Sequence, residues 1–65
     1  MLDVNALKAE MVRQGYTQSS LAEALGITSR TFTNRLKSGD FGSKEIEMLI
    51  DLLKLKDPMS IFFAN

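Results

Sequence analysis

The amino-acid sequence predicts a small all-α domain, a compact bundle of four to five short helices. Three observations support this fold class. Apolar residues recur three and four positions apart, which is the spacing of one helix face. Capping residues precede these apolar stretches, and glycines follow several of them. The length of 65 residues fits one domain, in which folding buries only roughly 60% of the surface that the unfolded chain exposes.

The first helix is expected over residues 4–14. Asp3 precedes it and has the side chain of a good N-cap. The apolar residues that follow are spaced as one buried face: Val4, Leu7 and Met11. Gly15 is expected to end this helix, because glycine adopts the left-handed conformation that closes a helix at little cost.

Two further helices are expected over residues 18–25 and 29–37. Thr17 and Thr28 each stand directly before one of them, where a hydroxyl can accept a backbone N–H of the first turn. Gly26 lies between the two and is expected to end the first. The sequence therefore predicts two short helices joined by a tight glycine turn.

The helix over 29–37 has two unlike faces. Phe32 and Leu36 lie four residues apart on the face that is expected to pack. The opposite face carries hydrogen-bonding and basic side chains at helical spacing: Arg30, Thr33, Asn34 and Lys37. In the major groove an arginine can bind guanine, and an asparagine can bind adenine, through two hydrogen bonds. This face predicts contacts with DNA.

A fourth helix is expected over residues 44–55, with Ser43 as its N-cap. Glu45 in the first turn suits the helix dipole. One buried face is formed by Ile46, Leu49, Ile50 and Leu53. The helix carries more apolar residues than this face requires, which suggests a second contact.

A last short helix is expected over residues 58–63. Asp57 and Pro58 mark its start, because proline at the first helical position loses no hydrogen bond. Phe41, in the preceding loop, is expected to anchor that loop in the core. The surplus apolar side chains of the last two helices predict a homodimer interface: Met48, Leu52, Leu55 and Phe63.

Composition argues against several classes of function. The chain has no cysteine and no histidine, so disulfides, thiol nucleophiles and the usual zinc ligands are not expected. No arrangement of carboxylates or nucleophile–base pairs predicts an enzyme. We expect no cofactor, metal or small-molecule ligand. No stretch of about 18 apolar residues is present, so a cytoplasmic protein without membrane contact is expected.

The formal net charge of zero argues against nucleic-acid binding, which basic domains favour. The charges are, however, segregated along the chain. Residues 28–44 contain four basic residues and one acidic residue, a net charge of +3. From residue 45 onward the sequence contains two basic and four acidic residues, a net charge of −2. This distribution suits a protein that binds DNA with one side.

A resemblance to a known family covers most of the chain. The stretch from Thr17 to Leu36 contains, in order, Thr-Gln, Leu-Ala, Leu-Gly-Ile and a capping threonine. It resembles the helix-turn-helix of the lambda-repressor-like, Cro-type (XRE) regulators, in which these residues recur in this order. The segment from Asp57 to Ala64 is similar to the tail of small phage-encoded regulators of the same group.

The resemblance implies a repressor of phage or prophage origin that binds a pseudo-palindromic operator in double-stranded DNA as a homodimer. It implies base contacts from Ser29, Arg30, Thr33 and Asn34. It implies phosphate contacts from Gln18, Thr28, Lys37 and Lys44. Gln18 is also expected to brace the recognition helix.

A second hypothesis keeps the fold and changes the partner. A small modulator could bind another repressor protein through its apolar C-terminal half. In that case Arg30 and Asn34 could be replaced without loss of activity, whereas Leu52 or Phe63 could not.

Overall fold

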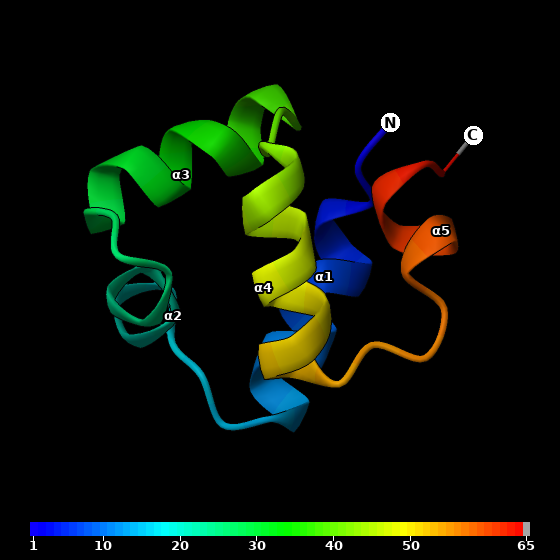
Figure 1. Ribbon diagram of the computed structural model, residues 1–65, viewed down its shortest axis with the longest axis horizontal. Helices are drawn as coiled ribbons and strands as arrows, with labels where there is room; N and C mark the ends of the chain where they lie inside the picture. Colours follow the sequence, from blue (N-terminus) through cyan, green and yellow to red (C-terminus); the bar gives the residue numbers. More distant parts are fainter. Residues whose placement is uncertain (65) are drawn as a thin grey trace.

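The computed structural model describes residues 1–64, which fold into five α-helices and no strand (Figure 1). The helices are α1 (Val4–Arg13), α2 (Gln18–Leu25), α3 (Ser29–Ser38), α4 (Ser43–Leu53) and α5 (Pro58–Phe62). The predicted all-α bundle is therefore confirmed. The observed helices differ from the expected ranges by at most two residues at either end, and the bounds of α2 match.

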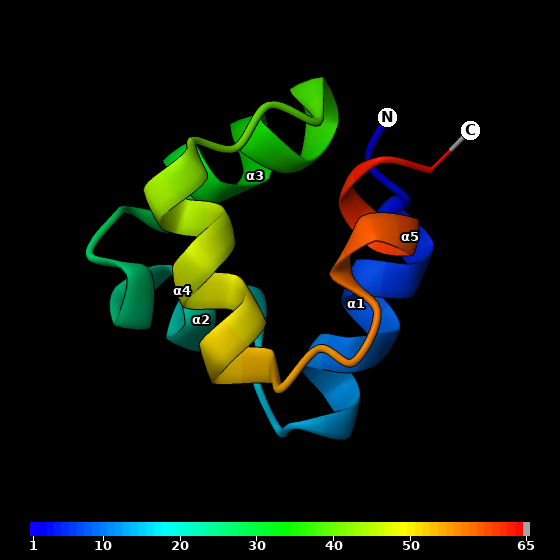
Figure 2. The same ribbon diagram turned by 45° about the vertical axis from the view of Figure 1, so that its right-hand side comes forward.

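Helix α4 lies in the middle of the bundle, with α2 and α3 on one side and α1 and α5 on the other (Figure 1). The first residues of the chain and α5 lie close together in both views (Figures 1 and 2). The backbone N–H of Asp3 donates a hydrogen bond of 2.7 Å to the carbonyl of Ile61, which ties the first residues to α5. Met1 and Leu2 also line a hollow together with Leu36 and Gly39, so the first residues of the chain lie between α5 and the C-terminal end of α3.

The core draws its side chains from all five helices. Its largest fully buried side chains are Phe32, Leu7, Leu21, Leu49 and Leu53. Burying one such side chain contributes about 2 kcal/mol. Phe41, as expected, anchors its loop in this core: its ring lies 5.8 Å from that of Phe32 and 6.5 Å from that of Phe62, centroid to centroid. Tilted aromatic contacts of this kind add to the energy of burial.

Four predicted N-caps are confirmed. In each, a side-chain oxygen accepts the backbone N–H three residues later, over 3.0 to 3.4 Å: Asp3, Thr17, Thr28 and Asp57. Gly15 and Gly26 follow α1 and α2 in the left-handed conformation, each with φ of +78°. Local sequence signals therefore define most of the helix ends.

The N-cap of α4 was predicted wrongly. Ser43 is the first helical residue, and Gly42 occupies the capping position. The backbone N–H of Gly42 donates a 3.0 Å hydrogen bond to Oε1 of Glu45, three residues later. A glutamate at this position satisfies a backbone donor for which the helix offers no backbone carbonyl.

Helix α4 also ends earlier than expected, at Leu53 instead of residue 55. Lys54 adopts a left-handed conformation, with φ of +52°, and the backbone N–H of Leu55 donates to the carbonyl of Ile50 over 3.0 Å. These features close a helix in the manner usually reserved for glycine. A lysine here gives no signal in the sequence, which explains the error.

Within residues 1–64, no helix combines the length and the apolar character that a membrane-spanning helix needs.

Candidate nucleic-acid interface

Helices α2 and α3 form a closely packed, steeply crossed pair. In Figure 1, α2 is seen nearly end-on while α3 lies across the view. Ala22 on α2 is fully buried, and its small side chain permits the close approach that the sequence suggested. The N–H of Ile27 donates to the carbonyl of Ala22 over 3.0 Å, and the Ile27 side chain packs against the core. The turn at Gly26 thus fixes the angle between the two helices.

One side of α3 is directed away from the core, as predicted. Phe32 and Leu36 are buried. The exposed side chains form what we call the α3 polar face: Ser29, Arg30, Asn34 and Lys37. Within residues 1–64 these side chains take part in none of the observed side-chain hydrogen bonds or ion pairs. Their donors are therefore free for an external partner.

Thr33 differs from its neighbours on α3, because it is half-buried. Its hydroxyl donates a hydrogen bond of 3.3 Å to Oε1 of Gln18, the first residue of α2. This contact bears out the expectation that Gln18 braces α3. It also holds the Gln18 amide so that its NH₂ group, with two donors, is left without a partner among the described side chains.

A shallow groove of about 290 Å³ adjoins the α3 polar face. It is lined by residues of α1, α2 and α3: Val4, Lys8, Gln18, Thr33, Leu36 and Lys37. Lys8 and Lys37 are exposed and stand in no ion pair within residues 1–64. The N-terminus of α2, the positive end of its dipole, opens at Gln18. Two ammonium groups and a helix N-terminus around one groove suit a phosphate group.

The sequence did not point to Lys8. It lies on the first helix, where a lysine with no motif around it looks like any solvated charge. Only the packing of α1 against α2 and α3 brings it to the groove that Gln18 and Lys37 share. No signal within the sequence could have selected it.

Arg35, counted in the sequence among the basic residues of this region, is not a free cation. Its Nη1 atom lies 2.9 Å from Oε1 of Glu45, and its side chain is 35% exposed. The same carboxylate oxygen caps α4 through Gly42. Arg35 therefore links α3 to the start of α4, and the exposed positive charge of this region is carried by Arg30, Lys37 and Lys44, beside one exposed acid, Asp40.

Two expected phosphate ligands lie at the edges of this surface. Thr28 is exposed, but its hydroxyl already accepts the backbone N–H of Thr31 at 3.1 Å and donates to the Thr31 hydroxyl at 2.9 Å. Lys44 is exposed in the first turn of α4, next to the residue that pairs with Arg35. Lys44 therefore lies near the C-terminal end of α3.

The residues expected at a dimer interface are exposed to different degrees. Phe63 is 60% exposed and Met48 is 36% exposed, whereas Leu52 is half-buried. Leu55 is a correction: only 8% of it is exposed, because it packs in the core after the left-handed turn at Lys54. Leu55 was expected at a dimer interface, but it belongs to the core.

Comparisons of the chain with protein-family models, with curated proteins and with solved structures find no significant match.

Proposed function

We propose that this protein is a sequence-specific DNA-binding regulator of the helix-turn-helix class, a Cro-like repressor, in which α3 is the recognition helix. The observation that carries the proposal is the α3 polar face. It presents an arginine, an asparagine and a lysine that are exposed and have no partner within residues 1–64. Beside it lies a groove with two lysines and the N-terminus of α2.

In this proposal α3 enters the major groove of DNA, and different side chains contact base edges and phosphates. Arg30 and Asn34 read base edges, because guanidinium and amide groups match guanine and adenine with two hydrogen bonds each. Ser29 and the methyl group of Thr33 contribute at the edges of the reading surface. Gln18 binds a phosphate with its free NH₂ group and fixes the register of α3 on the duplex.

Lysines supply the affinity that does not depend on sequence. Lys8 and Lys37 line the groove at Gln18, so a phosphate bound there would be attracted by both positive charges. Lys44 extends the phosphate contacts to the C-terminal end of α3. The net charge of the whole chain is zero, so this local excess of positive charge orients the molecule toward DNA.

We further propose that the protein acts as a homodimer. One module of 65 residues reads few base pairs, whereas two recognition helices about 34 Å apart read two half-sites on one face of DNA. The exposed apolar side chains of Met48 and Phe63, and the half-buried Leu52, are the candidates for the contact. Sedimentation equilibrium with and without DNA tests this: a monomer mass at every concentration in both conditions contradicts it.

Selection from random-sequence DNA with the purified protein, at about 0.1 M salt, tests the function itself. Salt of this strength screens exposed charges beyond about 10 Å and so reduces non-specific attraction. The proposal predicts enrichment of a palindrome with half-sites about one helical turn apart. A folded sample that enriches no sequence contradicts it.

A second candidate function follows from the exposed apolar residues. Met59 in α5 and Phe63 directly after this helix are 65% and 60% exposed. Large apolar side chains exposed to this degree are suited to contact with a partner protein. A modulator that binds another repressor through this half would need these side chains and not Arg30. Loss of regulation in Phe63→Ser, with Arg30→Ala fully active, would favour the modulator over the DNA-binding regulator.

A further inference from the structure

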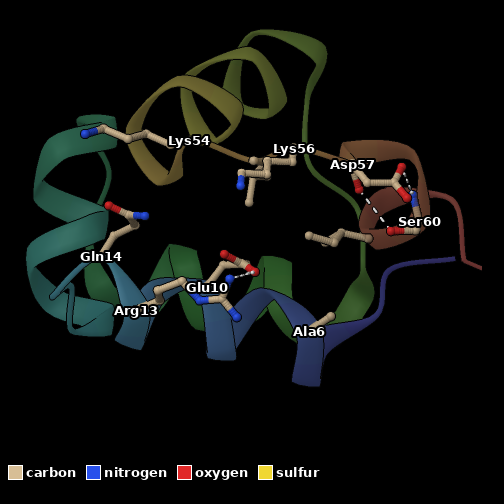
Figure 3. A pocket seen from close by; sticks show the side chains of 10 residues that line it. Ala6, Glu10, Arg13, Gln14, Lys54, Lys56, Asp57 and Ser60 are labelled. Atoms are coloured by element: carbon tan, nitrogen blue, oxygen red, sulfur yellow. Dashed lines mark hydrogen bonds and ion pairs between the residues drawn. The ribbon is translucent and has the colours of Figure 1, made fainter.

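A second hollow of the molecule lies away from the proposed DNA-binding surface. It is a cavity of about 500 Å³ between α1 and the segment that joins α4 to α5 (Figure 3). None of its lining residues belongs to α2 or α3. Its apolar wall is made of Ala6, Leu55 and Ile61. Cavities of this size, with an apolar wall and a few polar groups, are typical of sites for small molecules.

The rim of this cavity carries charges of both signs, but the acidic groups are already engaged. Glu10 pairs with Arg13, at 3.6 Å, on the same helix. Asp57 caps α5 by accepting a backbone N–H at 3.4 Å (Figure 3). Lys54 and Lys56 are exposed and have no ion pair within residues 1–64. The Asp57 carboxylate keeps its charge, because a backbone N–H is neutral, and the lining residues carry a net charge of +1: Arg13, Lys54 and Lys56 against Glu10 and Asp57.

We propose that this cavity binds a small organic anion, a monocarboxylate with an aliphatic body. The aliphatic part lies on the apolar wall, and the carboxylate lies at the ammonium group of Lys56, because the Lys54 side chain is directed away from Lys56 and Ala6 (Figure 3). The net charge of +1 compensates one carboxylate, whereas a doubly charged group such as a phosphate monoester would leave one negative charge uncompensated beside Asp57. This proposal is independent of DNA binding and replaces the expectation, from the sequence, that the protein takes no small-molecule ligand.

A titration of the ¹⁵N-labelled full chain with octanoate, followed by NMR, tests the site, with 1-octanol as the neutral analogue. The proposal predicts saturable shifts of backbone amides around the cavity, at Ala6, Gln14 and Lys56. It predicts about threefold weaker binding of 1-octanol, since one exposed ammonium group contributes roughly this factor. Equal binding of the two compounds contradicts a role for Lys56.

Two variants and a control locate the site. Lys56→Gln should weaken octanoate binding about threefold. Lys44→Gln removes the same charge from the first turn of α4, away from the cavity, and should leave octanoate binding unchanged. Ala6→Leu places a larger side chain at the apolar wall and should weaken octanoate and 1-octanol alike. The amide spectrum of each variant reports whether it is folded. Shifts that gather at Met48 and Phe63, no saturable shift, or equal effects of the two lysine changes would overturn the proposal.

Discussion

The hydroxyl of Thr33 donates a 3.3 Å hydrogen bond to the side-chain oxygen of Gln18, fifteen residues earlier in the chain. The bond joins the proposed recognition helix to the first turn of the helix before it. Because Gln18 uses its oxygen inside the protein, its NH₂ group is left to donate outward. A contact within the protein thereby sets the orientation of a donor on the proposed DNA-binding surface.

Thr33→Val keeps the size of the side chain and removes the hydroxyl, so it tests this coupling. We expect DNA binding to weaken by about 0.5 to 1.5 kcal/mol, which is the usual contribution of one hydrogen bond. The loss should be the same on selected and unrelated duplexes, because Gln18 is assigned to a phosphate. Fluorescence anisotropy measures both affinities. In a Gln18→Ala background, Thr33→Val should cost little, and an undiminished cost would contradict the coupling.

Lys8 is the residue of the surface that only the structure identifies, and Lys8→Ala tests it. We expect weaker binding to all DNA sequences and a fall of about 0.9 in the slope of log affinity against log salt, because one phosphate contact is lost. Lys37→Ala should behave in the same way. Lys56→Ala, on the other side of the molecule, is the matched control and should leave the slope unchanged. A slope unchanged in Lys8→Ala would remove this residue from the interface.

Glu45 connects two features, since one carboxylate oxygen accepts from Gly42 at 3.0 Å and pairs with Arg35 at 2.9 Å. Glu45→Ala loses both, and we expect the free energy of unfolding to fall by about 1 to 2 kcal/mol. Glu45→Gln keeps an oxygen for the cap and should cost less. Urea unfolding measures each value. Glu47→Ala, an exposed acid on the same helix, should change little, and a loss equal to that of Glu45→Ala would contradict this account.

Lys54 is the one residue other than glycine with positive φ within residues 1–64. The left-handed conformation costs such a residue roughly 1 to 2 kcal/mol, and glycine avoids this cost while losing more conformational entropy on folding. Lys54→Gly should therefore stabilise the protein by about 0.5 to 1 kcal/mol, read as a higher melting temperature. Lys56→Gly, where φ is not positive, should destabilise it. The opposite order would show that the turn after α4 differs from the one described.

The parts of the fold that could be predicted depend on neighbours in sequence. Thr17 and Thr28 cap helices because their hydroxyls reach a backbone N–H three residues away, and Gly26 ends a helix by its own conformational freedom. The periodicity of Phe32 and Leu36 was enough to separate the buried side of α3 from its exposed side.

The parts that could not be predicted depend on tertiary packing. The pairing of Arg35 with Glu45 requires the loop between α3 and α4 to bring the two helices together, and sequence spacing says nothing of that. Leu55 looked like surplus apolar surface because its helix was expected to continue through it. The left-handed Lys54 turns the chain instead and directs Leu55 into the core.

The central claim is that α3 reads DNA bases, and the binding of Arg30→Ala to the selected operator and to a scrambled duplex tests it most directly. Arg30 is exposed and unpaired within residues 1–64, so the substitution should leave the fold intact. The account predicts a loss of about 1 to 3 kcal/mol on the operator, little change on the scrambled duplex, and relaxed preference at one base position. Equal losses on the two duplexes would contradict base reading by α3.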